Sequence, residues 1–432
     1  MSNAKDGERR GGDGRREHEL REQHIRRLKY FRRVMPLLDR LHEVGTARDR
    51  AGNRRMFFDD YAKLVLLYLL NPLIDSMRLL QEASGLGRVA RALGVKRFSV
   101  GSFSEAPAVF DPEALRHVIA ELAEQLRPLS SDPRLWDVKH LITLADSTLL
   151  RTLPKLTETL YGRLRDGGAA HAWRLHTHLV LGEAVPELIV RTAPRGAGNT
   201  EVQHLSEHLR PGRCYVLDRG FQDAGLFNDI HAAGSSYVCR ARQNLAPQVI
   251  EDRPLSAASR GAGVVRDARV RVSLGSDRPS DHPLRLVEVV VEPHRKRTRR
   301  DKNGVALDVS VTTMLILTDL LDEPPELVAL IYRYRWTIEL FFRLLKQLLG
   351  CRHLLSQRPG GIDIQICCAV IAAMLIHLQT GRKPTKAIVF VLGLYLAGWA
   401  SEREVLERLN RPDNTGVKRR AKDALWAKLG VR

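Results

Sequence analysis

Three acidic residues, Asp146, Asp218 and Glu339, occupy positions at which carboxylates could act together. The apolar segments 141–145 and 214–217 are predicted to be short buried strands, and an aspartate directly follows each of them. In open α/β sheets, sites form at the ends of strands. We therefore expect Asp146 and Asp218 to contribute to one site, with Glu339 added to it from a helix.

Two aspartates and one glutamate form a site of hard oxygen ligands, which suits Mg²⁺ or Mn²⁺ and not zinc. Two such ions would clamp an in-line displacement at phosphorus. One ion would activate the attacking water or DNA 3′-hydroxyl, and the other would stabilise the leaving oxygen. Because carboxylates can bridge the two ions, we expect each of the three side chains to be essential.

Glu339 lies in the segment 324–349, which is predicted to be one long helix. At about 100° per residue, Tyr332, Arg335, Glu339 and Lys346 fall on one narrow stripe that could follow a phosphate backbone. Taken alone, this stripe is better explained as a solvated polar face with salt bridges within the helix. The two aspartates at strand ends shift the balance toward a functional site.

The same residues resemble a known signature. Tyr332-x2-Arg335-x3-Glu339-x6-Lys346 is similar to the Tyr-Arg-Glu-Lys signature of bacterial insertion-sequence transposases of the insertion-sequence-four family. The segment 218–221, Asp-Arg-Gly-Phe, resembles the second aspartate motif of that family. The segment 146–148, Asp-Ser-Thr, with Leu-Pro at 153–154, resembles the first motif, and the resemblance covers roughly residues 135–380.

The resemblance implies a DDE transposase with a ribonuclease-H-like catalytic fold. It implies that Asp146, Asp218 and Glu339 bind two Mg²⁺ or Mn²⁺ ions, and that the chain cleaves transposon ends and joins them to target DNA. The implied partners are double-stranded DNA, as terminal inverted repeats and target, and a second copy of the chain in a homodimer on DNA.

By the same resemblance, several polar side chains would contact DNA phosphates. Arginine and lysine suit this task by charge, and arginine also by its bidentate fork. Arg219 could instead pair with a carboxylate, and the basic turn with Arg295 and Arg297 could be only a solvated hairpin tip. The contacts expected by the resemblance are Tyr332, Arg335, Lys346 and Arg219. The basic turn is expected to contact phosphates because of its charge alone, through Arg295 and Arg297.

One departure concerns the cleavage route. Some relatives are thought to use a tryptophan in the β-rich insertion to hold a flipped base while a DNA hairpin forms. No tryptophan lies between Asp218 and Trp336 in this chain. A flipped base would need another wedge, for which Tyr237 and His294 are candidates, so the hairpin route stays open.

The charge balance independently favours an anionic partner. Lys and Arg number 69 against 50 Asp and Glu, which gives a net charge of +19. The charged N-terminus lacks the apolar region of a signal peptide. The longest apolar runs, 366–376 and 387–400, are shorter than the roughly 18–20 residues of a membrane span. We therefore expect a cytoplasmic bacterial protein that binds the nucleoid, and no membrane partner.

The number and spacing of the five cysteines predict that their side chains are reduced thiols. Their number is odd, and no spacing matches a zinc motif. Cys367 and Cys368 lie in an apolar helical stretch, and we expect them in the core.

The order of predicted elements after residue 135 is typical of a mixed α/β sheet flanked by helices. Predicted strands at 264–272, 283–292 and 306–316, with an Asn-Gly turn at 303–304, interrupt this order and predict a β-rich insertion. We expect five parts in total: a disordered tail at 1–17, a helical DNA-binding domain at 18–130, a catalytic domain at 135–242 and 312–380, the β-rich insertion at 243–311, and a basic helical region at 381–432.

Two pairs of histidines give weaker signals. A polar strand face explains His176 and His178 better than a metal pair does. His204 and His208 are four residues apart on a predicted helix, but no glutamate directly follows His204, so the zinc-protease pattern is absent. We expect these two to be surface residues.

Three alternatives to a transposase remain. The first is a nuclease of the same fold that cuts without strand transfer. The second is a catalytically silent, transposase-derived DNA-binding protein, which the three retained carboxylates argue against. The third is an RNA-binding protein, for which the aromatic content of 6% offers few stacking side chains.

Overall fold

The structure is a computed structural model of the 432-residue chain. The residues it describes are 29–44, 52, 54–71, 73–126, 132–151, 161–163, 169–182, 186–192, 201–274, 279–291, 312–349, 355–356, 358–380, 386–396 and 399–410.

A ten-stranded mixed sheet runs through the middle of the molecule, in the order β2-β3-β1-β5-β6-β10-β9-β8-β7, with β4 also paired to β3. The pairs β1–β5 and β5–β6 are parallel, and the other pairs are antiparallel. The predicted mixed α/β sheet is therefore confirmed. The strands are β1 (Leu141–Arg151), β2 (Tyr161–Arg163), β3 (Ala169–Val180), β4 (Pro186–Thr192), β5 (Arg213–Leu217), β6 (Ser236–Arg240), β7 (Gln248–Asp252), β8 (Val264–Arg271), β9 (Leu284–Val291) and β10 (Thr312–Thr318).

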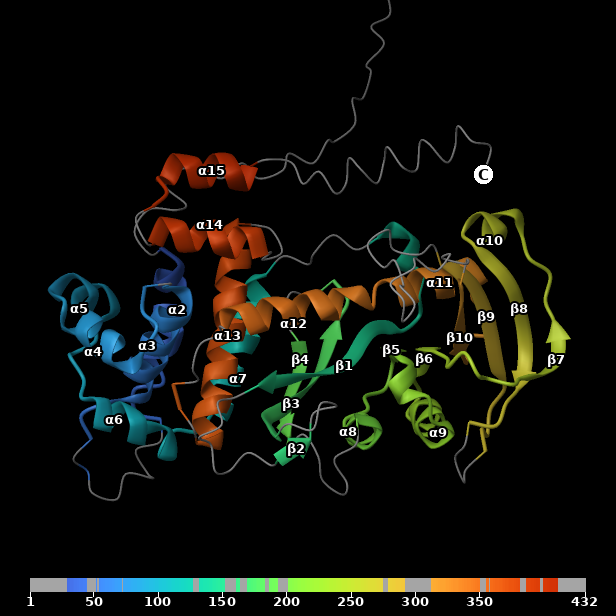
Figure 1. Cartoon of the computed structure of the whole chain (residues 1–432), viewed down its shortest axis with the longest axis horizontal. Helices are drawn as coiled ribbons and strands as arrows, with labels where there is room; N and C mark the ends of the chain where they lie inside the picture. Colours follow the sequence, from blue (N-terminus) through green and yellow to red (C-terminus); the bar gives the residue numbers. More distant parts are fainter. Residues whose placement is uncertain are drawn as a thin grey trace, which may run out of the picture.

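Helices cover both faces of the sheet (Figure 1). Helices α8 and α9 lie against one face, and α11 and α12 cross the other. The helices are α2 (Lys29–Asp39), α3 (Phe58–Leu70), α4 (Met77–Gly85), α5 (Gly87–Leu93), α6 (Val100–Glu105), α7 (Glu113–Gln125), α8 (Glu201–Glu207), α9 (Ala224–Ala232), α10 (Ala257–Gly261), α11 (Pro325–Arg333), α12 (Trp336–Leu348), α13 (Pro359–Thr380), α14 (Lys386–Leu396) and α15 (Glu402–Asn410).

Strand alternation divides the interior into two cores. Leu144 and Val216 pack in the core shared with α11, α12 and α13, whereas Leu217 packs in the core under α8 and α9. Successive side chains of a strand point to opposite faces. Asp146, two residues after Leu144, and Asp218, two after Val216, therefore point toward the face that α11 and α12 cover.

Strand β1 is longer than expected. It was predicted to stop at Asp146, but it continues to Arg151 because β3 pairs with it along this length, with Asp146 opposite Thr177. The parallel neighbour β5 does end at Leu217, as predicted. Asp146 therefore lies within a strand, beside the point where the neighbouring strand stops.

The segment 243–311 contributes strands to the same sheet. Strand β10 pairs with β6 on one side and with β9 on the other, and β8 and β7 extend the sheet beyond β9. Figure 1 shows these strands at the end of the molecule opposite the N-terminal helices. The basic turn with Arg295 and Arg297, between β9 and β10, lies outside the described residues.

The predicted single helix over 324–349 is instead two helices. Helix α11 ends at Arg333 and α12 begins at Trp336. Around the break, backbone hydrogen bonds join residues three apart, including Arg335 N–H to Tyr332 O at 3.0 Å and Thr337 N–H to Tyr334 O at 2.8 Å. These bonds form a tighter turn than an α-helix does, so a constant 100° step does not hold along the whole segment.

Helix α13 is an apolar helix that lies between the N-terminal helices and the sheet. Its residues Pro359–Leu378 are long and apolar enough to cross a membrane, but 83% of the most apolar window is buried inside the protein. The expectation that no apolar segment is long enough to span a membrane was wrong. Isolated polar residues such as Gln365 interrupt the contiguous apolar run in the sequence, but the helix as a whole remains apolar. The burial is that of a core helix.

The cysteine prediction is confirmed where the structure describes the side chains. Cys214, Cys239 and Cys368 are buried, Cys367 is partly buried, and all four are free thiols. Cys351 lies outside the described residues.

Candidate active site

Asp146 and Asp218 lie at the same level of two neighbouring parallel strands. Leu144 is in register with Val216, and each aspartate follows two residues later. Asp218 keeps an extended backbone, with φ −85° and ψ 168°, so it continues the alternation of β5. The predicted pairing of these two carboxylates is therefore a direct result of strand register.

Tyr332 reaches this point from the end of α11. Its side chain is buried, and its hydroxyl donates a hydrogen bond to Asp218 Oδ1 at 3.3 Å. Burial raises the pKa of Tyr332 to about 12, so the hydroxyl keeps its proton and acts as a donor at neutral pH. A phenol in this place orients the Asp218 carboxylate.

Arg335, in the break between the two helices, joins the other two carboxylates. Its Nη1 lies 3.4 Å from Asp146 Oδ2, and its Nη2 bonds to Glu339 Oε1 one turn later. The side chains of Asp146, Asp218 and Glu339 are 20%, 34% and 31% exposed, so each remains open to a ligand. The break in the helix thus places one guanidinium between carboxylates from β1 and α12.

The environment of Asp146 disfavours its charge. Burial raises its pKa to about 6, against the hydrogen bond from Ser147 N–H at 2.7 Å and the attraction of Arg335. The nearby carboxylates of Glu201 and Asp218 raise the pKa further. A divalent cation bound here would offset both the burial and the repulsion, so the residues fit such an ion by the type of their ligand atoms. Their carboxylates are not among the groups of described residues whose ligand atoms all lie within 4.8 Å of one another, and Arg335 lies between Asp146 and Glu339.

Glu201 is a nearby carboxylate that the sequence did not single out. It begins α8, and its Oε1 accepts hydrogen bonds from Ser147 Oγ and Arg174 Nη1. Ser147 and Arg174 lie on the face of β1 and β3 opposite the Asp146 side chain. Glu201 therefore supports the strand that carries Asp146 from behind.

Several cations surround the carboxylates. Arg240, at the end of β6, has Nη1 3.9 Å from Asp218 Oδ1 and was not anticipated. Arg219, directly after Asp218, and Lys346, on α12, are both exposed, as a contact to an anionic ligand requires. The predicted contacts Arg295 and Arg297 lie outside the described residues.

The rings of His176, His204 and His208 lie close together between α8 and β3. His176 and His178 are buried on the face of β3 that α8 covers. His204 and His208, predicted to be surface residues, are both partly buried: the His204 ring stacks on His176 with centroids 4.3 Å apart, and its side chain is 14% exposed. Helix α8 packs these rings against the sheet, which local spacing could not indicate.

Residues 138–375 match the family described as Transposase DDE domain, which is more than half of the chain. The chain therefore belongs to this family. The matched region includes Asp146, Asp218 and Glu339, and it includes both helices of the break that carries Arg335.

A curated relative, named "Putative transposase y4zB" in Sinorhizobium fredii, is 29% identical over 171 residues. The match covers 39% of this chain and 43% of the relative, so the chain spans about two fifths of that protein's length. A solved structure, the cryo-EM structure of piggyBac transposase synaptic complex with hairpin DNA, aligns over 89% of this chain and 82% of that chain, with 14% identity and a TM-score of 0.42.

Proposed function

We propose that this protein is a DNA transposase that cleaves transposon ends and transfers them into target DNA. The observation that carries the proposal is that Arg335 contacts both Asp146 of β1 and Glu339 of α12, next to Asp218 at the end of β5, in a chain of the Transposase DDE domain family. Carboxylates from three separate elements would supply the hard oxygen ligands that Mg²⁺ or Mn²⁺ prefers.

The proposal includes a ribonuclease-H-like catalytic domain. The strand order β4-β3-β1-β5-β6, with the first two pairs antiparallel and the next two parallel, supports it. It also includes the insertion-sequence-four signature at Tyr332, Arg335, Glu339 and Lys346. The first three of these residues contact Asp146, Asp218 or one another.

Each side chain has a separate task in the proposed reaction. Asp146, Asp218 and Glu339 would hold two Mg²⁺ or Mn²⁺ ions. When bound, these ions would activate the attacking oxygen and neutralise charge on the leaving oxygen. Tyr332 holds the Asp218 carboxylate in place.

The cations bind the DNA in this proposal. Arg335, Lys346, Arg219 and Arg240 would receive the phosphates, which contribute most of the affinity of proteins for DNA. A net charge of +19 supports a DNA partner for the chain as a whole. We further propose that the chain acts as a homodimer on DNA in the bacterial cytoplasm.

The decisive experiment is DNA cleavage and strand transfer with Mg²⁺ or Mn²⁺, on DNA ends from the element that encodes the chain. Asp218→Asn removes one metal-binding charge with almost no change of shape. We expect the wild type to cut and join DNA, and we expect Asp218→Asn to bind the ends but to lose at least about a hundredfold in cutting, as for loss of a group that stabilises the transition state.

Glu251→Gln is a matched control, because Glu251 is an exposed carboxylate on the edge strand β7, and it should cut normally. Cutting without joining by the wild type would favour the nuclease. Tight binding without cutting would favour a DNA-binding descendant of a transposase.

A further inference from the structure

The Glu201 carboxylate belongs to a closed group of three side chains on the face of the sheet that α8 covers. Glu201 begins α8, and its Oε1 accepts hydrogen bonds from Ser147 Oγ of β1 and from Arg174 Nη1 of β3. Arg174 Nη1 also donates to Ser147 Oγ at 3.0 Å. Each of the three side chains is therefore bonded to the other two.

This group holds the Ser147 hydroxyl in one orientation. A serine hydroxyl can donate one proton and can accept through its lone pairs. Here the proton goes to Glu201, and a lone pair accepts from Arg174. The side chains of Glu201 and Arg174 are only 29% and 24% exposed, so water has limited access to these bonds. Hydrogen bonds with charged partners are also stronger than neutral ones.

Ser147 connects this group to Asp146 through its main chain. The Ser147 N–H donates to Asp146 Oδ1 at 2.7 Å. The last β1 residue in register with β5 is Leu144, so β5 does not pair with β1 at Ser147. Neighbouring side chains of a strand point to opposite faces. Ser147 therefore bonds to Glu201 on one face of the sheet and orients the Asp146 carboxylate toward the other.

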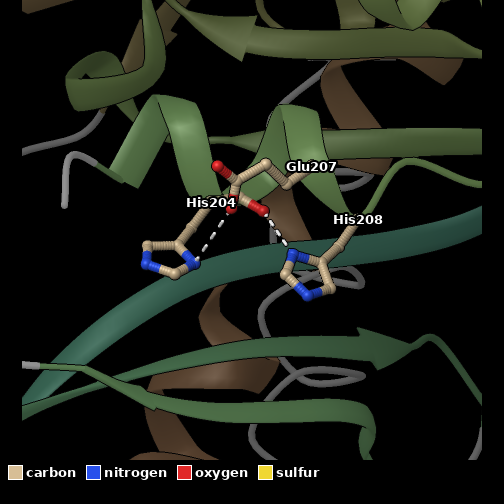
Figure 2. A group of neighbouring side chains, drawn as sticks. All are labelled: His204, Glu207 and His208. Carbon is tan, nitrogen blue, oxygen red and sulfur yellow. Dashed lines mark hydrogen bonds and ion pairs between the residues drawn. The ribbon is translucent and has the colours of Figure 1, made fainter. Parts of the chain in front are cut away.

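Helix α8 itself is held against the sheet. The His204 ring stacks on His176 of β3 with centroids 4.3 Å apart. Figure 2 shows His204, Glu207 and His208 at the end of the helix, where His208 Nδ1 lies 2.8 Å from the main-chain carbonyl oxygen of His204. A carbonyl oxygen only accepts, so His208 donates this bond and caps the helix. These contacts fix the helix that carries Glu201.

The same carboxylate adjoins the turn that follows Asp218. A Cβ on Gly220 would lie 3.5 Å from Glu201 Oε2, which is van der Waals contact. Helix α8 packs against both β1 and this turn, Arg219–Phe221. Glu201 therefore lies where the segments that carry the two aspartates meet, on the side of the sheet away from their carboxylates.

We propose that Glu201 is a positioning residue for the metal-binding carboxylates, and that it acts on Asp146 through Ser147. This inference rests on the proposed function, because it assigns Glu201 a role at the same site. Tyr332 holds the Asp218 carboxylate by a direct hydrogen bond, and Glu201 with Ser147 performs the corresponding task for Asp146. Partners that orient a metal ligand from outside typically contribute about 10–100-fold to metal affinity or activity.

The first measurement is the affinity of the full chain for Mn²⁺ without DNA, by electron paramagnetic resonance titration. Glu201→Ala and Ser147→Ala should each weaken Mn²⁺ binding about 10–100-fold. Ser147→Ala removes no charge, so it separates positioning from the loss of the Glu201 charge. The double variant should bind no more weakly than the weaker single variant, because the two side chains act in one chain of contacts. Ser147→Thr keeps the hydroxyl and should bind Mn²⁺ nearly as tightly as the wild type.

Glu187→Ala is the matched control. Glu187 also bonds to two arginines, Arg210 and Arg213, and its side chain is 18% exposed. Its removal should lower the unfolding temperature, as Glu201→Ala does, but should leave the Mn²⁺ affinity unchanged. An equal loss of Mn²⁺ affinity in Glu187→Ala, or a loss in Ser147→Thr as large as in Ser147→Ala, would overturn the inference.

A second readout needs neither metal nor DNA. Hydrogen–deuterium exchange of a peptide that spans Ser147 should be faster in Glu201→Ala than in the wild type, and unchanged in Glu187→Ala, because local protection follows local contacts. If the wild type neither binds Mn²⁺ nor cuts DNA while this exchange responds, the proposed function fails but the hold of Glu201 on Asp146 stands. DNA cutting by the wild type, with Mn²⁺ affinity and exchange unchanged in Glu201→Ala, would overturn the inference alone.

Discussion

At the scale of single residues, the main feature is that Arg335 forms ion pairs with two of the carboxylates. Its guanidinium contacts Asp146 and Glu339, which are two of the three proposed metal ligands. An ion that binds these carboxylates must compete with Arg335 for them.

Arg335→Ala should therefore strengthen Mn²⁺ binding in the absence of DNA. We expect a gain of several-fold, because a partly exposed ion pair is worth on the order of 1 kcal/mol. Electron paramagnetic resonance titration at pH 8, where Asp146 with its pKa of about 6 is ionised, measures this affinity. Arg333→Ala, an exposed arginine of α11, is the control and should leave it unchanged. Weaker Mn²⁺ binding in Arg335→Ala would mean that the arginine holds the carboxylates in position and does not compete with the ion.

At the scale of elements, a buried ion pair fixes the segment that leads into α11. Arg285 of β9 and Asp267 of β8 form a doubly bonded pair at 2.7 and 2.8 Å, and both side chains are at most 3% exposed. Arg285 Nη1 also donates to the carbonyls of Leu320 and Glu323, each at 2.6 Å. The strands beyond β6 thus help to position the helix that carries Tyr332.

Asp267→Ala should lower the free energy of unfolding by about 3–5 kcal/mol, because it leaves Arg285 charged, buried and without its carboxylate. Urea denaturation measures the change. The control is Asp252→Ala, which removes the exposed partner of Arg266 on the neighbouring strands, and there a loss of only about 0–1 kcal/mol is expected. Similar losses in the two variants would rule out a structural role specific to the Arg285 pair.

The packing of α8 over β3 predicts a pH dependence. Burial lowers the pKa of His178 from 6.5 to about 4, and nearby His208, Arg210 and Arg213 lower it further. The unfolded chain therefore takes up a proton between about pH 6.5 and 4 that the folded chain does not. The stability from this residue is present above pH 6.5 and is lost as the pH falls toward 4.

His178→Phe keeps a ring in the same place but cannot titrate. Urea midpoints at pH 7 and pH 5, in EDTA, should fall less for this variant than for the wild type. For one proton, the loss of free energy of unfolding on acidification should differ between the two proteins by at most about 1.4 kcal/mol per pH unit. Equal acid sensitivity of the two proteins would show that His178 does not contribute to it.

At the scale of the whole molecule, α13 connects the N-terminal helices to the sheet. It packs in the same core as residues of α3, α7 and α12. Its start approaches the N-terminal helices closely, because a Cβ on Gly361 would lie 2.4 Å from Ser356 Cβ and 3.0 Å from Pro107 Cβ. A glycine at this position allows the two parts to touch.

Gly361→Ala should lower the free energy of unfolding by about 1–3 kcal/mol, which is the usual cost of overpacking. Thermal or urea unfolding checks it. Gly101→Ala in α6 is the matched control, because a Cβ there would meet only Ser99 Oγ at 3.9 Å, and it should be neutral or slightly stabilising. A neutral Gly361→Ala would mean that Ser356 moves aside without cost.

The sequence by itself determined the carboxylates and the face they share. A strand alternates with a period of two, so the apolar residues before Asp146 and Asp218 predict that both aspartates follow the same face of one sheet, although only Asp218 lies at a strand end. The spacing of Tyr332, Arg335 and Glu339 likewise predicts that these three act together, and the structure brings them together with both aspartates. These predictions depend on spacings within short segments, which can be interpreted from the sequence without knowledge of the fold.

Only the tertiary structure showed the contacts between segments that are far apart in the sequence. Strand β1 continues past Asp146 because β3 pairs with it, and Glu201 meets Ser147 across 54 residues of sequence. The turn at Arg335 and the burial of His204 depend in the same way on what packs beside them. Nothing near these residues in the sequence specifies such contacts, because their free energy comes from partners that only the folded chain brings close.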